Sequence, residues 1–151
     1  MGSEAEGFKY IVRISDTDLD GNKTIVYGLC GVKGIGIRVA EVIARLVGVP
    51  RNTKLGELSD EKIEEIQGLI NSLGNKAPAW LLNRRKDWDT GVDKHLVSTD
   101  VIMQRNEDIN LLKKIRCYRG IRHELGQKVR GQRTRSNGRT GLALGVSRKR
   151  K

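Results

Sequence analysis

The sequence has little of several features that would define a function class at once. It contains no run of about 20 apolar residues, so no membrane-spanning helix is expected. Its two cysteines, Cys30 and Cys117, are too few for a disulfide framework. The first six residues are acidic and polar, unlike a secretory signal. We therefore expect a soluble, reduced protein of the cytoplasm that makes no contact with a membrane.

Residues that would support catalysis or hold a metal are also missing. His95 and His123 lie far apart in the chain, and neither forms a ligand cluster with a cysteine, which disfavours zinc. The run at residues 16–21 begins like a calcium loop, but Tyr27 stands at the twelfth position, where a glutamate should bind the ion. No catalytic triad or pair of carboxylates stands out. We predict no metal, no cofactor, no catalytic residue and no enzymatic activity.

Charge is the most informative feature that is present. The 151 residues carry 29 Lys and Arg against 18 Asp and Glu, a net charge of +11. Residues 1–100 are close to neutral, whereas residues 101–151 hold fifteen basic and three acidic side chains. Residues 126–151 have no acidic and few aliphatic side chains, so alone they should be disordered. A tail that merely aids solubility is the simpler alternative, but a single-sign field fits a polyphosphate partner better.

The spacing of apolar residues predicts a mainly helical protein. Residues 8–14 alternate like a short strand, residues 16–22 predict a loop, and residues 23–31 fit a strand or a helix equally. Helical spacing, N-cap residues and terminal glycines predict helices at residues 35–47, 59–74, 99–116 and 119–125. In the third of these we expect an inward face made of Ile102, Ile109, Leu112 and Ile115.

The segment at residues 75–98 is harder to interpret. Residues 78–82 favour a short helix, and residues 87–93 favour a turn. The segment contains both tryptophans, Trp80 and Trp88. The two tryptophans indicate that this segment packs against the rest of the protein.

A glycine-rich hairpin at residues 31–36 precedes the first predicted helix. It lacks the Ser or Thr that follows the lysine of a P-loop, and it lacks the third glycine of a dinucleotide-binding turn. It resembles instead the helix-hairpin-helix motif, in which a tight turn leaves the N–H groups of the next helix free for a phosphate. We predict a phosphate site at Lys33, Gly34, Gly36 and Arg38. A plain glycine turn between two packed helices remains an open alternative.

The last basic segment is the sharpest feature. Ile121 and Leu125 form an apolar pair on one helical turn, which leaves Arg119, Arg122 and His123 pointing outward. Beyond this turn, arginines alternate with Gly, Gln, Thr and Asn, a composition that suits phosphate and ribose contacts. The tail has no aromatic residue, so it should recognise the backbone and shape of a nucleic acid and not stack on its bases.

The predicted fold class is therefore mainly α. It comprises a small helical body with a helix-hairpin-helix-like (helix-two-turns-helix) motif, a short N-terminal β segment and an extended basic C-terminal tail. We place the globular body at residues 1–125 and the RNA-binding tail at residues 126–151.

These residues carry a resemblance to a known family. The run Arg119-Gly-x-Arg122-His123-x-x-Gly126, followed by Val129-Arg130-Gly131-Gln132-Arg133-Thr134, resembles the signature of the universal small-subunit ribosomal protein family numbered thirteen. The resemblance covers residues 8–151, including the hairpin and the basic extension. Residues 75–98 resemble the insertion that distinguishes the archaeal and eukaryotic members.

The resemblance implies a structural protein of translation in the head of the small ribosomal subunit. The partners that it implies are small-subunit rRNA, the peptidyl-site tRNA and the small-subunit protein numbered nineteen. Intersubunit bridges would add large-subunit rRNA and the large-subunit protein numbered five. It also implies that residues 23–31 hold the first helix of the hairpin. Besides the hairpin residues, the implied rRNA contacts are Arg119, Arg122, His123, Arg130, Gln132, Arg133, Arg135 and Arg139, and the residues nearest tRNA are Arg148, Lys149, Arg150 and Lys151.

The alternative function is that of a helix-hairpin-helix protein that binds or repairs DNA. This function explains the glycine hairpin but gives no reason for the Arg, Gly and Gln tail. Preferential binding to duplex DNA over folded rRNA would separate the two.

Overall fold

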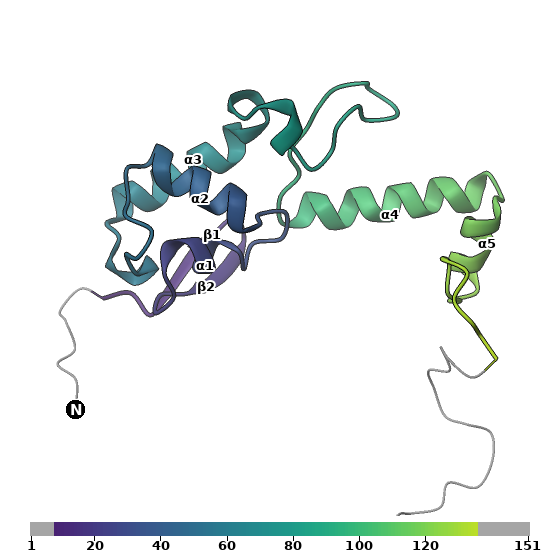
Figure 1. The fold of residues 1–151 in the computed structure, drawn as a ribbon, viewed down its shortest axis with the longest axis horizontal. Helices are drawn as coiled ribbons and strands as arrows, with labels where there is room; N and C mark the ends of the chain where they lie inside the picture. The colour runs from purple at the N-terminus through teal and green to yellow at the C-terminus, as the bar shows by residue number, and fades with distance from the viewer. Residues whose placement is uncertain (1–7, 136–151) are drawn as a thin grey trace, which may run out of the picture. The chain divides into compact units, whose positions relative to one another are not determined.

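A computed structural model describes residues 8–135 of the chain (Figure 1). The chain divides into two compact units, Met1–Met103 and Gln104–Lys151. The predicted mainly helical class is confirmed. The elements in chain order are β1 (Ile11–Ile14), β2 (Thr17–Asp20), α1 (Ile25–Leu29), α2 (Ile37–Leu46), the 3-10 turn η1 (Leu55–Glu57), α3 (Asp60–Lys76), the 3-10 turn η2 (Ala79–Leu81), α4 (Thr99–Lys114) and α5 (Tyr118–Glu124).

The N-terminal part of the chain is a β-hairpin. β1 pairs antiparallel with β2, so that Val12 lies opposite Leu19, and the side chains of both are buried. The prediction of a loop at residues 16–22 is therefore wrong, because residues 17–20 form the second strand. The aspartates in this segment have low β propensity, but cross-strand pairing and the burial of Leu19 outweigh that preference. Ser15 and Asp16 make the turn with φ of 47° and 58°.

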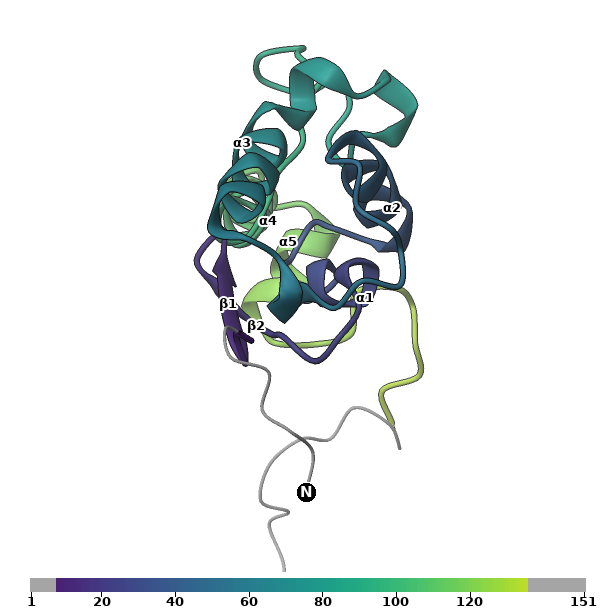
Figure 2. The same ribbon diagram turned by 90° about the vertical axis from the view of Figure 1, so that its left-hand side faces the viewer.

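The core of the first unit lies between the β-hairpin and the helices α1, α2 and α3 (Figure 2). α1 packs against α2, and α2 also contacts α3. Residues 23–31 fit a strand or a helix by their pattern, and the family resemblance implies a helix there. The helix α1 confirms this implication. α2 buries Val39 and Ile43, the face that helical spacing predicts. α3 starts after the predicted N-cap Ser59 and runs to Lys76, two residues beyond the glycine expected to end it.

The segment between α3 and α4 follows its prediction in outline and differs in detail. The short helix expected at residues 78–82 is the 3-10 turn η2. The expectation that the segment packs is confirmed, because Leu82 is buried and fixes the segment to the unit. The tryptophans that indicated this packing do not take part in it, since Trp80 is 73% exposed and Trp88 is 62% exposed. Composition alone does not show which apolar side chain of a short segment faces the core.

Helix α4 ends at Lys114, two residues before the predicted end, and buries none of its residues. The predicted inward face is therefore wrong: Ile102 and Ile115 are 42% and 63% exposed. Helical spacing puts these residues on one side of the helix, but that side is not buried, and Ile109 and Leu112 are only half-buried. α5 matches the helix predicted at residues 119–125 to within one residue. It ends before Gly126, which has a φ of +64°, as expected for a terminal glycine.

Candidate nucleic-acid interface

The hairpin that joins α1 to α2 depends on one glycine. Gly34 has a φ of +94°, and a Cβ built on it would lie 2.3 Å from the carbonyl oxygen of Leu96. The N–H of Ile35 donates to the carbonyl oxygen of Val32 at 3.1 Å and closes the turn. A residue with a side chain would therefore meet both a strained backbone and a clash. The predicted tight turn is confirmed here.

Residues 95–98 form hydrogen bonds with this hairpin. The N–H of Ser98 donates to the carbonyl oxygen of Lys33 at 2.7 Å, and Nε2 of His95 donates to that of Gly34 at 3.1 Å. Because a carbonyl can only accept, the His95 proton sits on Nε2, and the buried Nδ1 has no partner within the described residues. Burial lowers the pKa of His95, and the hydrogen bond to Gly34 opposes this shift. The hairpin carbonyls of Lys33 and Gly34 are thus occupied inside the protein.

The amino-terminal end of α2 is left open. Gly36 is its N-cap, with φ −99° and ψ 175°, and no side chain caps the helix. A Cβ at Gly36 would have no neighbour within 4 Å among the described residues. The first N–H groups of a helix have no intrahelical acceptor, so they and the helix dipole can bind an anion here. The exposed Lys33 lies three residues earlier.

The other predicted cation of the hairpin, Arg38, is already paired. Its Nη1 lies 3.2 Å from Oε2 of Glu41, and the second carboxylate oxygen of Glu41 accepts from Arg51. Glu41 is buried, whereas most of the Arg38 side chain is exposed. The three side chains keep one net positive charge beside the open helix end. Sequence reasoning missed Arg51, although an acidic residue on the apolar face of a helix is a signal that a cation must be near.

In the second unit, α5 is fixed tightly to the end of α4. Cys117 is the N-cap of α5: its Sγ accepts from the N–H of Gly120 at 3.4 Å and contacts the carbonyl oxygen of Leu112 at 3.4 Å. Gly120 is buried, and a Cβ there would lie 2.1 Å from that same oxygen. The two helices therefore approach at a position where only glycine fits.

Arg122 shapes the turn that follows α5. Its Nε donates to the carbonyl oxygen of Lys128 at 2.9 Å, and its Nη1 donates to the side-chain oxygen of Gln127. Its guanidinium also lies over the ring of Tyr118, 5.9 Å from the centroid. The side chain predicted to point outward is thus half-buried and engaged within the chain. Its predicted contact with RNA stays a prediction.

The remaining predicted ligands divide into exposed, half-buried and undescribed residues. His123 is half-buried. The exposed ones, which follow α5 or lie on it, are Arg119, Arg130, Gln132, Arg133 and Arg135. Outside the described residues lie Arg139 and the four predicted tRNA neighbours, Arg148, Lys149, Arg150 and Lys151. Residues 127–135 form no helix or strand.

Other kinds of site find no support within residues 8–135. That part of the chain has no group of three or more His, Cys, Asp or Glu side chains placed to hold a metal. None of its helices is long and apolar enough to cross a membrane. Cys30 packs against the core, and burial raises the pKa of its thiol, which favours the protonated form.

The fold and these surfaces define a class: a helix-hairpin-helix protein with a strongly cationic carboxyl-terminal unit. Comparisons with known proteins narrow this class. A family model described as ribosomal protein S13/S18 matches residues 13–140. The chain therefore belongs to the ribosomal protein S13/S18 family, as the resemblance indicated.

Curated relatives agree over most of the chain. The small ribosomal subunit protein uS13 of Methanospirillum hungatei is 49% identical over 149 residues, 99% of each chain. The protein of the same name from Archaeoglobus fulgidus is 53% identical over 144 residues, 95% of this chain and 99% of the relative. That of Methanocella arvoryzae is 53% identical over 141 residues, which span 93% of this chain but 63% of the relative.

Proposed function

We propose that the chain is a structural constituent of the small ribosomal subunit and binds small-subunit rRNA. The relatives named small ribosomal subunit protein uS13 support this function. The single observation that carries the RNA-binding part is the charge of residues 101–151, fifteen basic against three acidic side chains. Location in the ribosome, and so in the cytoplasm, follows from the same proposal. No enzyme family appears among the matches described above.

Phosphate recognition would use two different devices. The open end of α2 offers backbone donors, with Lys33, Gly34, Gly36 and Arg38 around it. The segment after α5 offers exposed guanidinium groups, each of which can donate to two phosphate oxygens at once. The proposed ligands in this part of the chain are Arg119, Arg122, His123, Arg130, Gln132, Arg133, Arg135 and Arg139. Arg38 would have to exchange Glu41 for phosphate, so we expect it to contribute less than the exposed arginines.

The finer assignments rest on the family resemblance. They are a position in the head of the subunit, contact with the small-subunit protein numbered nineteen, and bridges to large-subunit rRNA and the large-subunit protein numbered five. Residues 148–151 would approach the peptidyl-site tRNA. A helical body at residues 1–125 and an RNA-binding tail at residues 126–151 belong to the same proposal.

Salt dependence tests the RNA-binding part. Each phosphate contact adds about 0.7–0.9 to the slope of log affinity against log salt. The double variant Arg133→Gln/Arg135→Gln should therefore lower the slope on small-subunit rRNA by about 1.5. The matched control Lys62→Gln/Lys76→Gln removes two exposed charges from α3 and should leave the slope unchanged. Equal slopes for the two variants would contradict the proposed interface.

The second candidate function, DNA binding or repair, is favoured only by the hairpin geometry. Competition of duplex DNA against small-subunit rRNA for the unchanged chain distinguishes it. We expect the rRNA to win at equal nucleotide concentration and at every salt concentration tested.

A further inference from the structure

The α1–α2 pocket is a cavity of about 590 Å³ between α1, α2 and the loop that follows α2. Its volume falls in the range of protein pockets that bind small organic groups, about 300–1,000 Å³. The residues that line it are Thr24, Val26, Tyr27, Ile37, Glu41, Pro50, Arg51 and Asn52. The proposed phosphate ligands of the glycine hairpin are not among them. Phosphate recognition therefore leaves this pocket without a role.

Two kinds of flat side chain line the α1–α2 pocket. The phenol ring of Tyr27 is 66% exposed, and the guanidinium of Arg51 belongs to an exposed side chain. The aliphatic side chain of Ile37 adds an apolar surface that is 51% exposed. Unpaired bases of RNA stack on aromatic rings and on guanidinium planes. These side chains together therefore offer the surface on which a base stacks.

Polar groups that can pair with the edge of a base also line the α1–α2 pocket. The hydroxyl of Thr24 and the side-chain amide of Asn52 make no hydrogen bond within residues 8–135. A hydroxyl and an amide can each donate and accept, as the edges of the bases do. Both groups are thus free to select among bases.

The charges in the α1–α2 pocket cancel. Glu41 is buried, and its two carboxylate oxygens accept from Arg51 and, at 3.2 Å, from Arg38. Arg38 does not line the pocket, so the lining itself holds one carboxylate and one guanidinium. A phosphate inside it would meet the negative charge of Glu41, whereas a base is neutral. The pocket therefore suits the base of a nucleotide better than its phosphate.

The loop beside the pocket is fastened to the start of α1. The N–H of Ile25 donates to the carbonyl oxygen of Thr53 at 2.9 Å, and the N–H of Thr53 donates to that of Pro50 at 3.1 Å. The ion pair with the buried Glu41 holds the guanidinium of Arg51. A pocket ordered in this way before its ligand arrives loses little conformational entropy on binding.

The pocket is continuous with the open amino-terminal end of α2. Ile37, which lines the pocket, is the first residue of α2 and follows the N-cap Gly36. The free N–H groups at this end favour a phosphate. A phosphate bound there would bring the base of its own nucleotide to the pocket. This continuity favours a nucleotide over a protein side chain as the occupant.

We propose that the α1–α2 pocket receives one unpaired base of the small-subunit rRNA, which stacks on Tyr27 and pairs with Thr24, Asn52 or Arg51. The proposal deepens the proposed function and rests on it, because that function supplies the RNA. It gives the chain a contact with a base, whereas the basic tail is expected to recognise the backbone and shape of the RNA.

An alanine variant of Tyr27 tests the stacking. Tyr27→Ala should weaken binding to protein-free small-subunit rRNA by about tenfold or more. The slope of log affinity against log salt should stay the same, because the variant removes no charge. Tyr27→Phe keeps the ring and should bind within about twofold of the unchanged chain. The matched control Trp80→Ala removes another exposed aromatic side chain and should also stay within about twofold.

The outcomes separate the pocket from the function on which it rests. Unchanged affinity in Tyr27→Ala, an equal loss in Trp80→Ala, or a lower salt slope in Tyr27→Ala would overturn the pocket and leave rRNA binding intact. Normal rRNA binding by Tyr27→Ala together with faster release from small subunits would mean that a protein fills the pocket, which also overturns the proposal. If the unchanged chain does not bind the rRNA, the proposed function fails and the pocket fails with it.

Chemical modification of the RNA identifies the occupant. Dimethyl sulfate and a carbodiimide modify the pairing edges of unpaired bases, so a base held in the pocket is protected. With each chain at a concentration that saturates the rRNA, we expect at least one base that the unchanged chain and Trp80→Ala protect and that Tyr27→Ala leaves reactive. Identical protection by Tyr27→Ala and the unchanged chain would overturn the proposal.

Discussion

Substitution of Gly34 tests how the hairpin is built. In Gly34→Ala, the new Cβ would lie 2.3 Å from the carbonyl oxygen of Leu96, on a backbone with a φ of +94°. That oxygen cannot move freely because the amide of Asn83 donates to it at 2.7 Å. A left-handed conformation costs an alanine about 1–2 kcal/mol, and overpacking adds about 1–3 kcal/mol. We expect the free energy of unfolding to fall by about 2–5 kcal/mol.

The matched control is Gly36→Ala, two residues further along. Gly36 has an ordinary negative φ, and its Cβ would meet no described atom within 4 Å, so only the weaker N-cap preference of alanine counts. We expect a loss of about 0.5 kcal/mol. Urea unfolding followed by circular dichroism at the helical minimum measures both variants. Equal losses would refute the reasoning that a specific clash at Leu96 makes Gly34 necessary.

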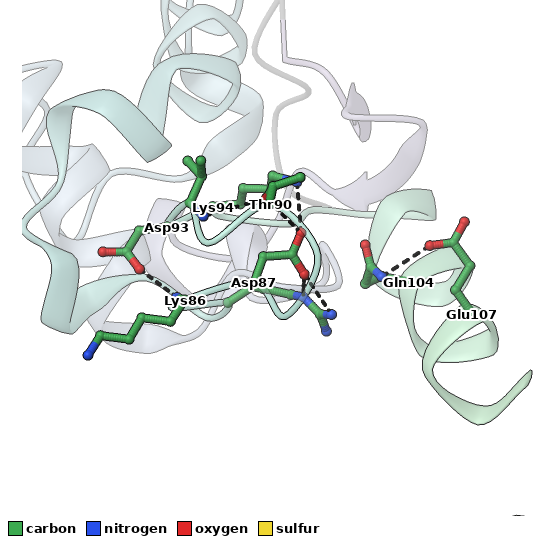
Figure 3. Close-up of polar contacts among 9 residues, drawn as sticks. Lys86, Asp87, Thr90, Asp93, Lys94, Gln104 and Glu107 are labelled. Carbon is green, nitrogen blue, oxygen red and sulfur yellow. Dashed lines mark hydrogen bonds and ion pairs between the residues drawn. The ribbon is translucent and has the colours of Figure 1, made fainter. Parts of the chain in front are cut away.

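Three other substitutions probe single contacts. Gly120→Ala should destabilise the α4–α5 turn by at least about 2 kcal/mol, because its Cβ would lie 2.1 Å from the carbonyl oxygen of Leu112. Thermal unfolding followed by the helical signal measures this destabilisation. Asp87→Asn should speed hydrogen exchange at the backbone N–H of Lys94, because the loop loses its carboxylate, which accepts from Arg84, Thr90 and Lys94 (Figure 3). In the unchanged chain, faster exchange at this N–H should appear only as the pH falls from 3.8 towards about 2, where Asp87 takes up its proton. The pKa of His95 is lowered in the folded chain, so the unfolded chain takes up this proton first and the free energy of unfolding should fall as the pH drops below 6.5. His95→Gln keeps a donor for the carbonyl oxygen of Gly34 and should remove this part of the pH dependence. An unchanged pH dependence would contradict the role given to His95.

The sequence predicts local geometry well where one residue type decides it. Gly34 and Gly126 predict turns because only glycine takes a positive φ without strain, and the structure has both turns. Ser59 also predicts the start of α3 correctly: it takes the extended N-cap conformation, although its side chain makes no capping hydrogen bond.

The same reasoning fails where the neighbours of a residue decide its place. Helical spacing places Ile102 on an inward face, and yet its side chain is exposed. β2 was missed because pairing with β1, and not the propensity of its aspartates, makes it a strand. Periodicity shows which residues share a face of an element, but not what covers that face.

The candidate site shows the same division. Charge and composition locate the cationic part of the chain, and five of its predicted ligands are exposed. They do not reveal that Arg122 is used to fasten the turn after α5, or that Arg38 is paired with Glu41. Such internal pairing depends on distances between side chains that a single sequence does not contain.

The measurement that tests the central claim most directly is the sedimentation of a tagged full-length chain through a sucrose gradient. The account predicts that the chain migrates with small subunits at low salt and leaves them progressively as salt rises, since phosphate contacts hold it. A chain that stays at the top of the gradient, or that migrates with duplex DNA in place of small subunits, would contradict it.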